Sequence, residues 1–207
     1  SAGTTFTISS AKLESTASTN NIDLQSTNSI IINDLVTNVA TSKTLTLNSP
    51  NSVKFQTGAG GFSMATDNKI KLTAAGASLL IDAKAGTGTG NVTVGALETK
   101  GSAGSITLKG VTANLFGNLT TDGGKVDFSG SSKVSLNANV TIDTANTATT
   151  AGDVDFGNAA LTAAAAGKRL TIDTSSNDNT GGTVSLGPVD NSGGSYVNQL
   201  TVKLFRS

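Results

Sequence analysis

The sequence predicts an all-β protein, a β-solenoid in which short parallel strands stack coil on coil around a narrow core. Three observations lead to this prediction. Short segments alternate apolar and polar residues, the turns between them are rich in Gly, Asn, Asp, Ser and Thr, and the last third of the chain repeats with a constant step. Alternation with a period of two places successive side chains on opposite faces, as in a strand with one buried face.

An apolar–polar–apolar triplet recurs along the chain, and each copy predicts one short strand. No segment has a sustained helical period. Only the alanines of residues 163–166 favour a helix, which Gly167 ends. The triplets are Phe6-Thr7-Ile8, Ile22-Asp23-Leu24, Leu45-Thr46-Leu47, Val53-Lys54-Phe55, Ile70-Lys71-Leu72, Val92-Thr93-Val94, Ile106-Thr107-Leu108, Val126-Asp127-Phe128, Val134-Ser135-Leu136, Val140-Thr141-Ile142, Val154-Asp155-Phe156, Leu170-Thr171-Ile172, Val184-Ser185-Leu186 and Leu200-Thr201-Val202.

The C-terminal third contains an internal repeat. Val140-Thr141-Ile142 returns as Leu170-Thr171-Ile172 and again as Leu200-Thr201-Val202, which is a step of 30 residues each time (140 to 170, 170 to 200). Val154-Asp155-Phe156 returns with the same step as Val184-Ser185-Leu186. A fixed period of this length is typical of solenoids and propellers.

A looser copy of this plan lies upstream, where Leu80-Ile81-Asp82 is followed by Val92-Thr93-Val94 after a slightly shorter turn. The first third is less regular, and three of its closely spaced strands would make a coil of about 25 residues. A period of about 25–30 residues divides the chain into roughly seven to eight coils. We therefore predict a single solenoid domain over residues 1–207, with less regular coils over 1–78 and clearer repeats over 79–205.

Two other all-β architectures fit the pattern less well. A sandwich needs strands of about five or six residues to seal its core, and most triplets here offer only two inward residues. Propeller blades have four strands and usually aromatic anchors, whereas this chain has one Tyr and no Trp. A parallel solenoid needs only stacked short strands.

The composition excludes several classes of partner. The 14 basic and 14 acidic residues balance and are evenly spread, so the sequence predicts no nucleic-acid surface. No apolar run approaches the roughly 20 residues of a membrane span. The chain has no Cys, which suits export through an oxidising compartment. It begins at Ser1 without a signal peptide, and we take it as a mature or excised product.

Residue types for catalysis are scarce. With no His and no Cys, the commonest general base, thiol and metal ligands are missing, and we predict no cofactor and no metal. The densest acidic group is Asp153 with Asp155, joined by Asp127 one coil earlier. Its ordinary interpretation is a solvated outer face, and the functional alternatives are glycosidase carboxylates or a calcium site.

Three further aspartates, Asp82, Asp143 and Asp173, each follow an apolar strand directly. We expect them to cap turns with their carboxylates and to stack at one corner of the solenoid. A calcium ladder is the alternative, although its glycine-rich nonapeptide is missing.

Both ends of the chain lack an obvious cap. A solenoid whose terminal coils are bare exposes strand edges and apolar core. Either the chain is a fragment of a longer repeat protein or its subunits stack end to end. We predict that the end strands mediate self-association, through the residues Phe6, Ile8, Leu200, Val202 and Leu204.

The pairing of Leu170-Thr171-Ile172-Asp173 with the segment at 181–187, joined by Gly, Asn and Thr corners, resembles the filamentous-haemagglutinin-type repeats of large bacterial surface proteins. The resemblance covers residues 79–205 best. It implies a single-stranded right-handed parallel β-helix and a role as adhesin, stalk or filament material. No Asn-Pro-Asn-Gly signature is present, so a secretion domain is not implied.

These observations lead to three functional hypotheses. The first is a non-enzymatic structural protein of the bacterial cell surface that forms a head-to-tail homopolymer, as a filament, sheath or layer. The second is an adhesin or stalk segment of a larger secreted protein, with a host or surface glycan or protein as its ligand. The third is a carbohydrate-active β-helix enzyme, which rests on the fold alone.

Overall fold

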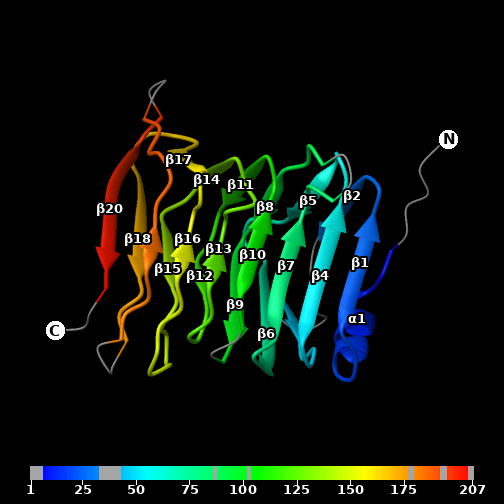
Figure 1. Ribbon diagram of the computed structural model, residues 1–207. Coiled ribbons are helices and arrows are strands. Elements are labelled where there is room, and N and C mark those ends of the chain that lie inside the picture. The colour runs from blue at the N-terminus through cyan, green and yellow to red at the C-terminus, as the bar shows by residue number, and fades with distance from the viewer. Residues whose placement is uncertain are drawn as a thin grey trace.

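A computed structural model describes residues 7–32, 43–85, 88–101, 104–176, 180–191 and 195–204. Each coil of the chain visits three parallel sheets in turn, here named sheets A, B and C (Figure 1). Sheet A consists of β1 (Ile22–Ser26), β4 (Ser52–Thr57), β7 (Ser78–Asp82), β10 (Ile106–Lys109), β13 (Val126–Asp127), β16 (Val154–Asp155) and β19 (Val184–Ser185).

Sheets B and C complete each coil. Sheet B consists of β2 (Ser29–Ile32), β5 (Gly61–Met64), β8 (Val92–Val94), β11 (Thr112–Leu115), β14 (Lys133–Leu136) and β17 (Ala160–Ala163). Sheet C consists of β3 (Thr44–Leu47), β6 (Lys69–Ala75), β9 (Ala96–Lys100), β12 (Leu119–Thr120), β15 (Val140–Asp143), β18 (Lys168–Asp173) and β20 (Val197–Lys203).

The fold is the predicted β-solenoid. Each strand from β4 to β19 pairs in parallel with the strand three before it in the chain, and β20 pairs with β18 because the described part of the last coil has no sheet B strand. The chain advances from one end of the stack to the other without reversing (Figure 1). The stack has about six coils, fewer than the seven to eight expected. In the last coil the sheet B strand is reduced to a single bridge between Leu161 and Val189.

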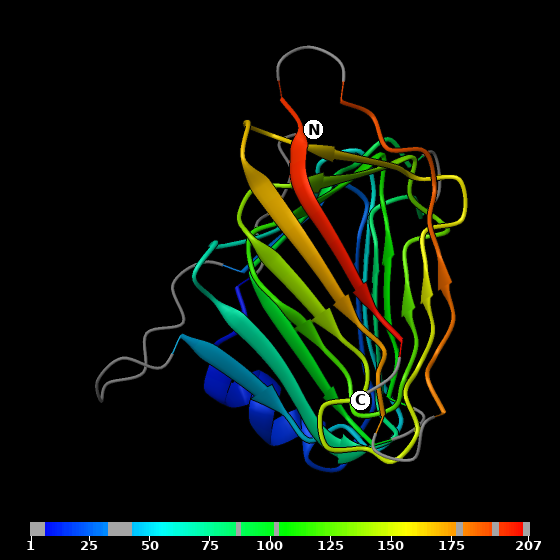
Figure 2. The same cartoon turned by 90° about the vertical axis from the view of Figure 1, so that its left-hand side faces the viewer.

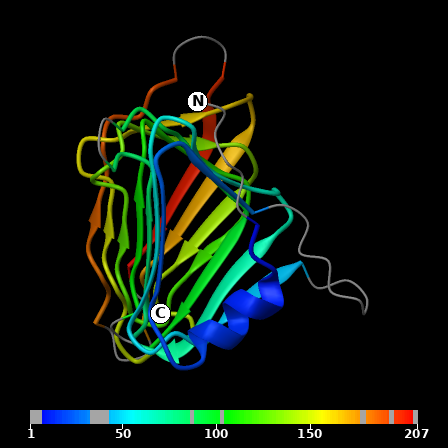
Figure 3. The same ribbon diagram turned by 90° about the vertical axis from the view of Figure 1, so that its right-hand side faces the viewer.

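One hydrophobic core runs along the inside of the stack. Seen along the stack, the three sheets form the sides of a roughly triangular section around it (Figures 2 and 3). Inward residues alternate with outward ones along each strand, as the pleat of a strand requires. Four phenylalanines are fully buried in the core as two tilted ring pairs, Phe55 with Phe62 at 5.3 Å and Phe128 with Phe156 at 4.9 Å between ring centroids.

The repeat of 30 residues is confirmed by strand register. Val140 pairs with Leu170, and Leu170 pairs with Leu200, all in sheet C. Val154 pairs with Val184 in sheet A. Thirteen of the fourteen triplets lie on or begin strands, so the alternation reports the buried face.

The looser upstream copy of the repeat was placed wrongly. Leu80 and Asp82 lie on β7 of sheet A and Val92 begins β8 of sheet B, whereas Leu170 and Val184 lie in sheets C and A. The segment therefore matches a different corner of the solenoid. Alternation is the same in all three sheets, so it does not reveal which sheet a strand joins.

The N-terminal segment departs from the prediction. Thr7 and Ile8 form no strand, and Phe6 lies outside the described residues. A helix, α1 (Ser10–Ala17), follows, and its N-cap Ser9 accepts a hydrogen bond from the backbone N–H of Lys12 at 3.2 Å. The alanine run expected to favour a helix forms none: Ala163 ends strand β17 and residues 164–166 lie in the turn that follows. Only Leu13 and Ala17 of α1 face the core, which leaves too faint a helical period to recognise.

Candidate functional site

The predicted acidic cluster lies on the outer face of sheet A and is held by a lysine. Asp127 and Asp155 are register partners on β13 and β16. The Nζ of Lys125 lies 2.9 Å from Oδ2 of Asp155 and 3.5 Å from Oδ2 of Asp127. Asp153 is turned to the next coil, where its Oδ1 accepts hydrogen bonds from the N–H and hydroxyl of Thr183 at 2.7 and 2.8 Å.

The hydrogen bonds within this cluster favour the ionised forms of Asp155 and Lys125. The hydrogen bond from Lys125, with a second from the N–H of Gly157, holds the pKa of Asp155 below its ordinary value. The hydrogen bond to Asp155 in turn raises the pKa of Lys125. A glycosidase acid needs a raised pKa, so Asp155 does not suit that role. Within the described part of the chain, no group of three or more acidic residues could hold a metal ion.

The corner aspartates cap turns, as predicted. Oδ1 of Asp143 accepts the N–H groups of Ala145 and Asn146 at 3.1 and 2.8 Å, and Oδ1 of Asp173 accepts that of Ser175 at 3.1 Å. The expectation of one common ladder was wrong for Asp82. Asp143 and Asp173 pair in sheet C, but Asp82 lies on sheet A, where it caps its own turn.

A row of buried hydroxyls lines the corner between sheets C and A. In successive coils a fully buried Thr donates a hydrogen bond across the corner to the carbonyl of the Gly that precedes the next sheet A strand. We call each pair a Thr–Gly clamp. The pairs are Thr99 with Gly104, Thr121 with Gly124 at 2.5 Å, Thr144 with Gly152 at 2.6 Å and Thr174 with Gly182 at 3.0 Å.

The glycine of the clamp is required by the neighbouring coil. A Cβ on Gly152 would lie 2.0 Å from the carbonyl oxygen of Gly124, and a Cβ on Gly182 would lie 2.1 Å from that of Gly152. Sequence reasoning missed the clamps. Their signal was present, because Thr144 and Gly152 return as Thr174 and Gly182 within the repeat of 30 residues.

The C-terminal end of the solenoid is open. Leu200 and Val202 of β20 are 36% and 37% exposed, whereas Leu170 and Ile172 one coil earlier are 1% and 0% exposed. Between β19 and β20 lies a cavity of about 430 Å³, which we call the C-terminal mouth. Its lining residues are Gly181, Gly182, Thr183, Val184, Leu186, Val202 and Leu204.

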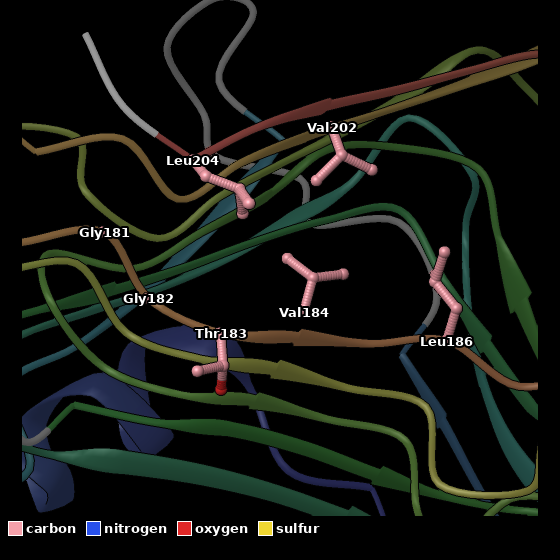
Figure 4. A pocket seen from close by; sticks show the side chains of 7 residues that line it. All are labelled: Gly181, Gly182, Thr183, Val184, Leu186, Val202 and Leu204. Carbon is pink, nitrogen blue, oxygen red and sulfur yellow. The ribbon is translucent and has the colours of Figure 1, made fainter.

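The mouth is the unfinished end of the core. Val184 and Leu186 point into it from one side, and Val202 and Leu204 from the other (Figure 4). Val184 lies next to Val154 in the sheet, and Val154 is fully buried. A further coil stacked here would therefore bury Val184 and Val202, just as their register partners Val154 and Ile172 are buried in the coil before.

At the N-terminal end, by contrast, the edge of sheet C is covered by α1. The helix lies against β3 (Figure 3), whose inward residues Leu45 and Leu47 are 1% and 0% exposed. Oε1 of Glu14 accepts a hydrogen bond from the backbone N–H of Thr46 at 2.8 Å. The expectation that neither end has a cap was wrong here, because a helix too short to be recognised shields the edge of sheet C.

The residues predicted for self-association fall at two different places. Leu200, Val202 and Leu204 lie at the C-terminal end and are 36–40% exposed. Ile8 is 38% exposed and precedes α1 without belonging to a strand, and Phe6 lies outside the described residues. Their role in self-association stays a prediction.

Comparison with known proteins gives no relative. No protein-family model, no curated protein and no solved structure matches the chain. The resemblance to filamentous-haemagglutinin-type repeats therefore stays a prediction. Among the described residues, no helix has the length and apolar character needed to cross a membrane.

Proposed function

We propose that the chain is a structural, non-enzymatic protein of the bacterial cell surface whose copies stack end to end into a filament, sheath or layer. The observation that carries this proposal is the C-terminal mouth, where the apolar columns of the core stop at exposed side chains. The low charge and the absence of Cys support an extracellular location.

The two ends of the stack are complementary in their apolar columns. The column that ends at Val184 begins at Ile22, six strands away in sheet A. The column that ends at Val202 begins at Leu45 in sheet C. In a head-to-tail joint that continues the register, Val184 of one copy would lie on Ile22 of the next, and Val202 on Leu45.

The outward-facing residues that would meet across this joint also carry no opposing like charges. Lys203 would lie over Thr46, and Ser185 over Asp23, so no like charges meet. Strand edges join by backbone hydrogen bonds. A head-to-tail contact that does not close on itself produces a filament.

A stalk segment of a larger secreted repeat protein is the second candidate. The observation that favours it is the contrast between the two ends, because α1 covers the edge of sheet C at one end while the core is exposed at the other, as in one segment of a longer rod. In that case further coils of the same chain would cover the mouth, and a host or surface glycan or protein would be the ligand.

Electron microscopy and sedimentation over a concentration series test the proposal. The wild-type chain should form fibres, and Val202→Asp should abolish them because it places a charge inside the joint. Thr201→Asp is the matched control, since Thr201 faces outward on the same strand. Discrete short rods at high wild-type concentration would instead favour the stalk segment. Fibres that survive in Val202→Asp would show that the mouth is not the joint.

A further inference from the structure

Helix α1 occupies the place where a preceding strand of sheet C would lie. The N–H of Lys69 on β6 donates to the carbonyl of Lys43 at 2.8 Å. Because backbone groups of a parallel strand point alternately to its two neighbours, the N–H of Thr46 faces away from β6. That is the donor which Glu14 satisfies at 2.8 Å. A carboxylate of α1 thus stands in for the backbone carbonyl of a missing strand.

The apolar side of α1 also takes the place of the missing strand's inward side chains. Ala17 is fully buried and Leu13 packs against the core cluster. Leu45 and Leu47 lie at the end of the stack and yet are as buried as residues of inner coils. The helix therefore supplies both the hydrogen bond and the apolar contacts that a strand of a preceding coil would supply.

In a head-to-tail joint, β20 of a second copy would lie along the edge of β3 that α1 covers. Continuing the register of sheet C puts Val202 on Leu45 and Lys203 beside Thr46. The strand and the helix cannot both occupy this edge. Joint formation and docking of α1 are therefore mutually exclusive at sheet C.

The helix is held weakly enough to be displaced. It has 8 residues, of which Ala17 alone is buried. Isolated helices shorter than about 12–15 residues are marginal in water, so α1 would not persist as a helix once it left β3. Side-chain hydroxyls of Ser15, Thr16 and Ser18 bond to carbonyls within the helix and give no hold on the sheet.

We propose that α1 is a displaceable cap that competes with the incoming β20 of a second copy and so controls end-to-end assembly. This inference rests on the proposed function. It assigns to the helix a regulatory role: chains with α1 docked grow poorly, and chains with α1 released stack head to tail.

A reversible lock on α1 tests the proposal in the full-length chain. The natural sequence has no Cys, so a Glu14→Cys, Thr46→Cys double variant can be joined specifically by a cleavable thiol-reactive linker. The linked protein should stay monomeric by sedimentation and electron microscopy, and cleavage of the linker should restore fibres. Thr93→Cys with Asn114→Cys is the matched control, because these outward residues are register partners on β8 and β11, the two middle strands of sheet B. Linking them should leave assembly unchanged.

A second variant tests the cap by weakening the docking of α1 instead of locking it. Glu14→Ala removes the hydrogen bond to Thr46 and should increase the nucleation rate of fibres by roughly two- to tenfold. Lys12→Ala, on the same exposed helix, should leave the rate unchanged. Equal assembly of the linked and cleaved double variant would overturn the cap while leaving end-to-end stacking intact. Failure of the wild-type, cleaved and Glu14→Ala proteins to assemble would overturn both.

Discussion

At the scale of single residues, the buried hydroxyls of the Thr–Gly clamps fix where four successive coils turn from sheet C to sheet A. At a corner of a solenoid, backbone groups leave the strand ladder and still lie beside the core, so they need other hydrogen-bond partners. Thr144 solves this with one side chain, which is fully buried and donates to the carbonyl of Gly152 at 2.6 Å. The clamp thus satisfies a polar group where no neighbouring strand is available.

Thr144→Val should destabilise the protein, because it leaves the buried carbonyl of Gly152 without this donor at nearly constant volume. We expect a loss of about 1–3 kcal/mol in the free energy of unfolding, measured with urea. Thr141→Val is the control, since Thr141 faces outward on β15, the strand that Thr144 directly follows, and should change stability by less than about 0.5 kcal/mol. An equal effect of the two substitutions would argue against the clamp.

At the scale of elements, most strands with two large inward residues are predicted from the sequence, although β5, with Phe62 and Met64 buried, is absent from the predicted triplets. Val140 and Ile142, or Leu170 and Ile172, make such strands. Strand β9 was missed because its inward residues are Leu97 and Thr99, and the second is a hydroxyl that bonds across the corner to Gly104. A search for alternating apolar and polar residues does not detect a strand in which a polar residue faces the core.

The ion pair between Lys125 and Asp155, on neighbouring strands of sheet A, also makes the stability of the protein depend on pH in acid. The hydrogen bond from Lys125 lowers the pKa of Asp155 in the folded state, so the unfolded chain binds a proton more readily. The resulting stability is fully present above the ordinary Asp value of about 3.8 and is lost as the pH falls through the lower folded pKa.

Asp155→Asn should therefore flatten the decline of unfolding free energy below about pH 4. The difference should stay under about 1 kcal/mol, because the pair is partly exposed. Thermal melts between pH 2 and pH 7 measure this, and Lys125→Met should flatten the same decline. A wild-type slope in both variants would contradict the assignment.

At the scale of the whole molecule, the solenoid has two unlike ends. The C-terminal end was predictable, because Leu200 and Val202 belong to a repeat whose inner copies must be buried. The N-terminal end was not, because α1 shows only Leu13 and Ala17 to the core and depends on Glu14 reaching the backbone of β3. Such a contact joins residues 32 apart and leaves no local pattern.

The Thr–Gly clamp also makes the stack indifferent to the length of the loop it closes. The same clamp closes over a separation of 3 residues at Thr121 and of 8 residues at Thr144. A guest peptide spliced between Thr147 and Ala148 should leave the melting temperature within a few degrees of the parent, measured by circular dichroism. Guests carried on adjacent coils would stand about 4.8 Å apart, so the rod would act as a molecular ruler for whatever it displays.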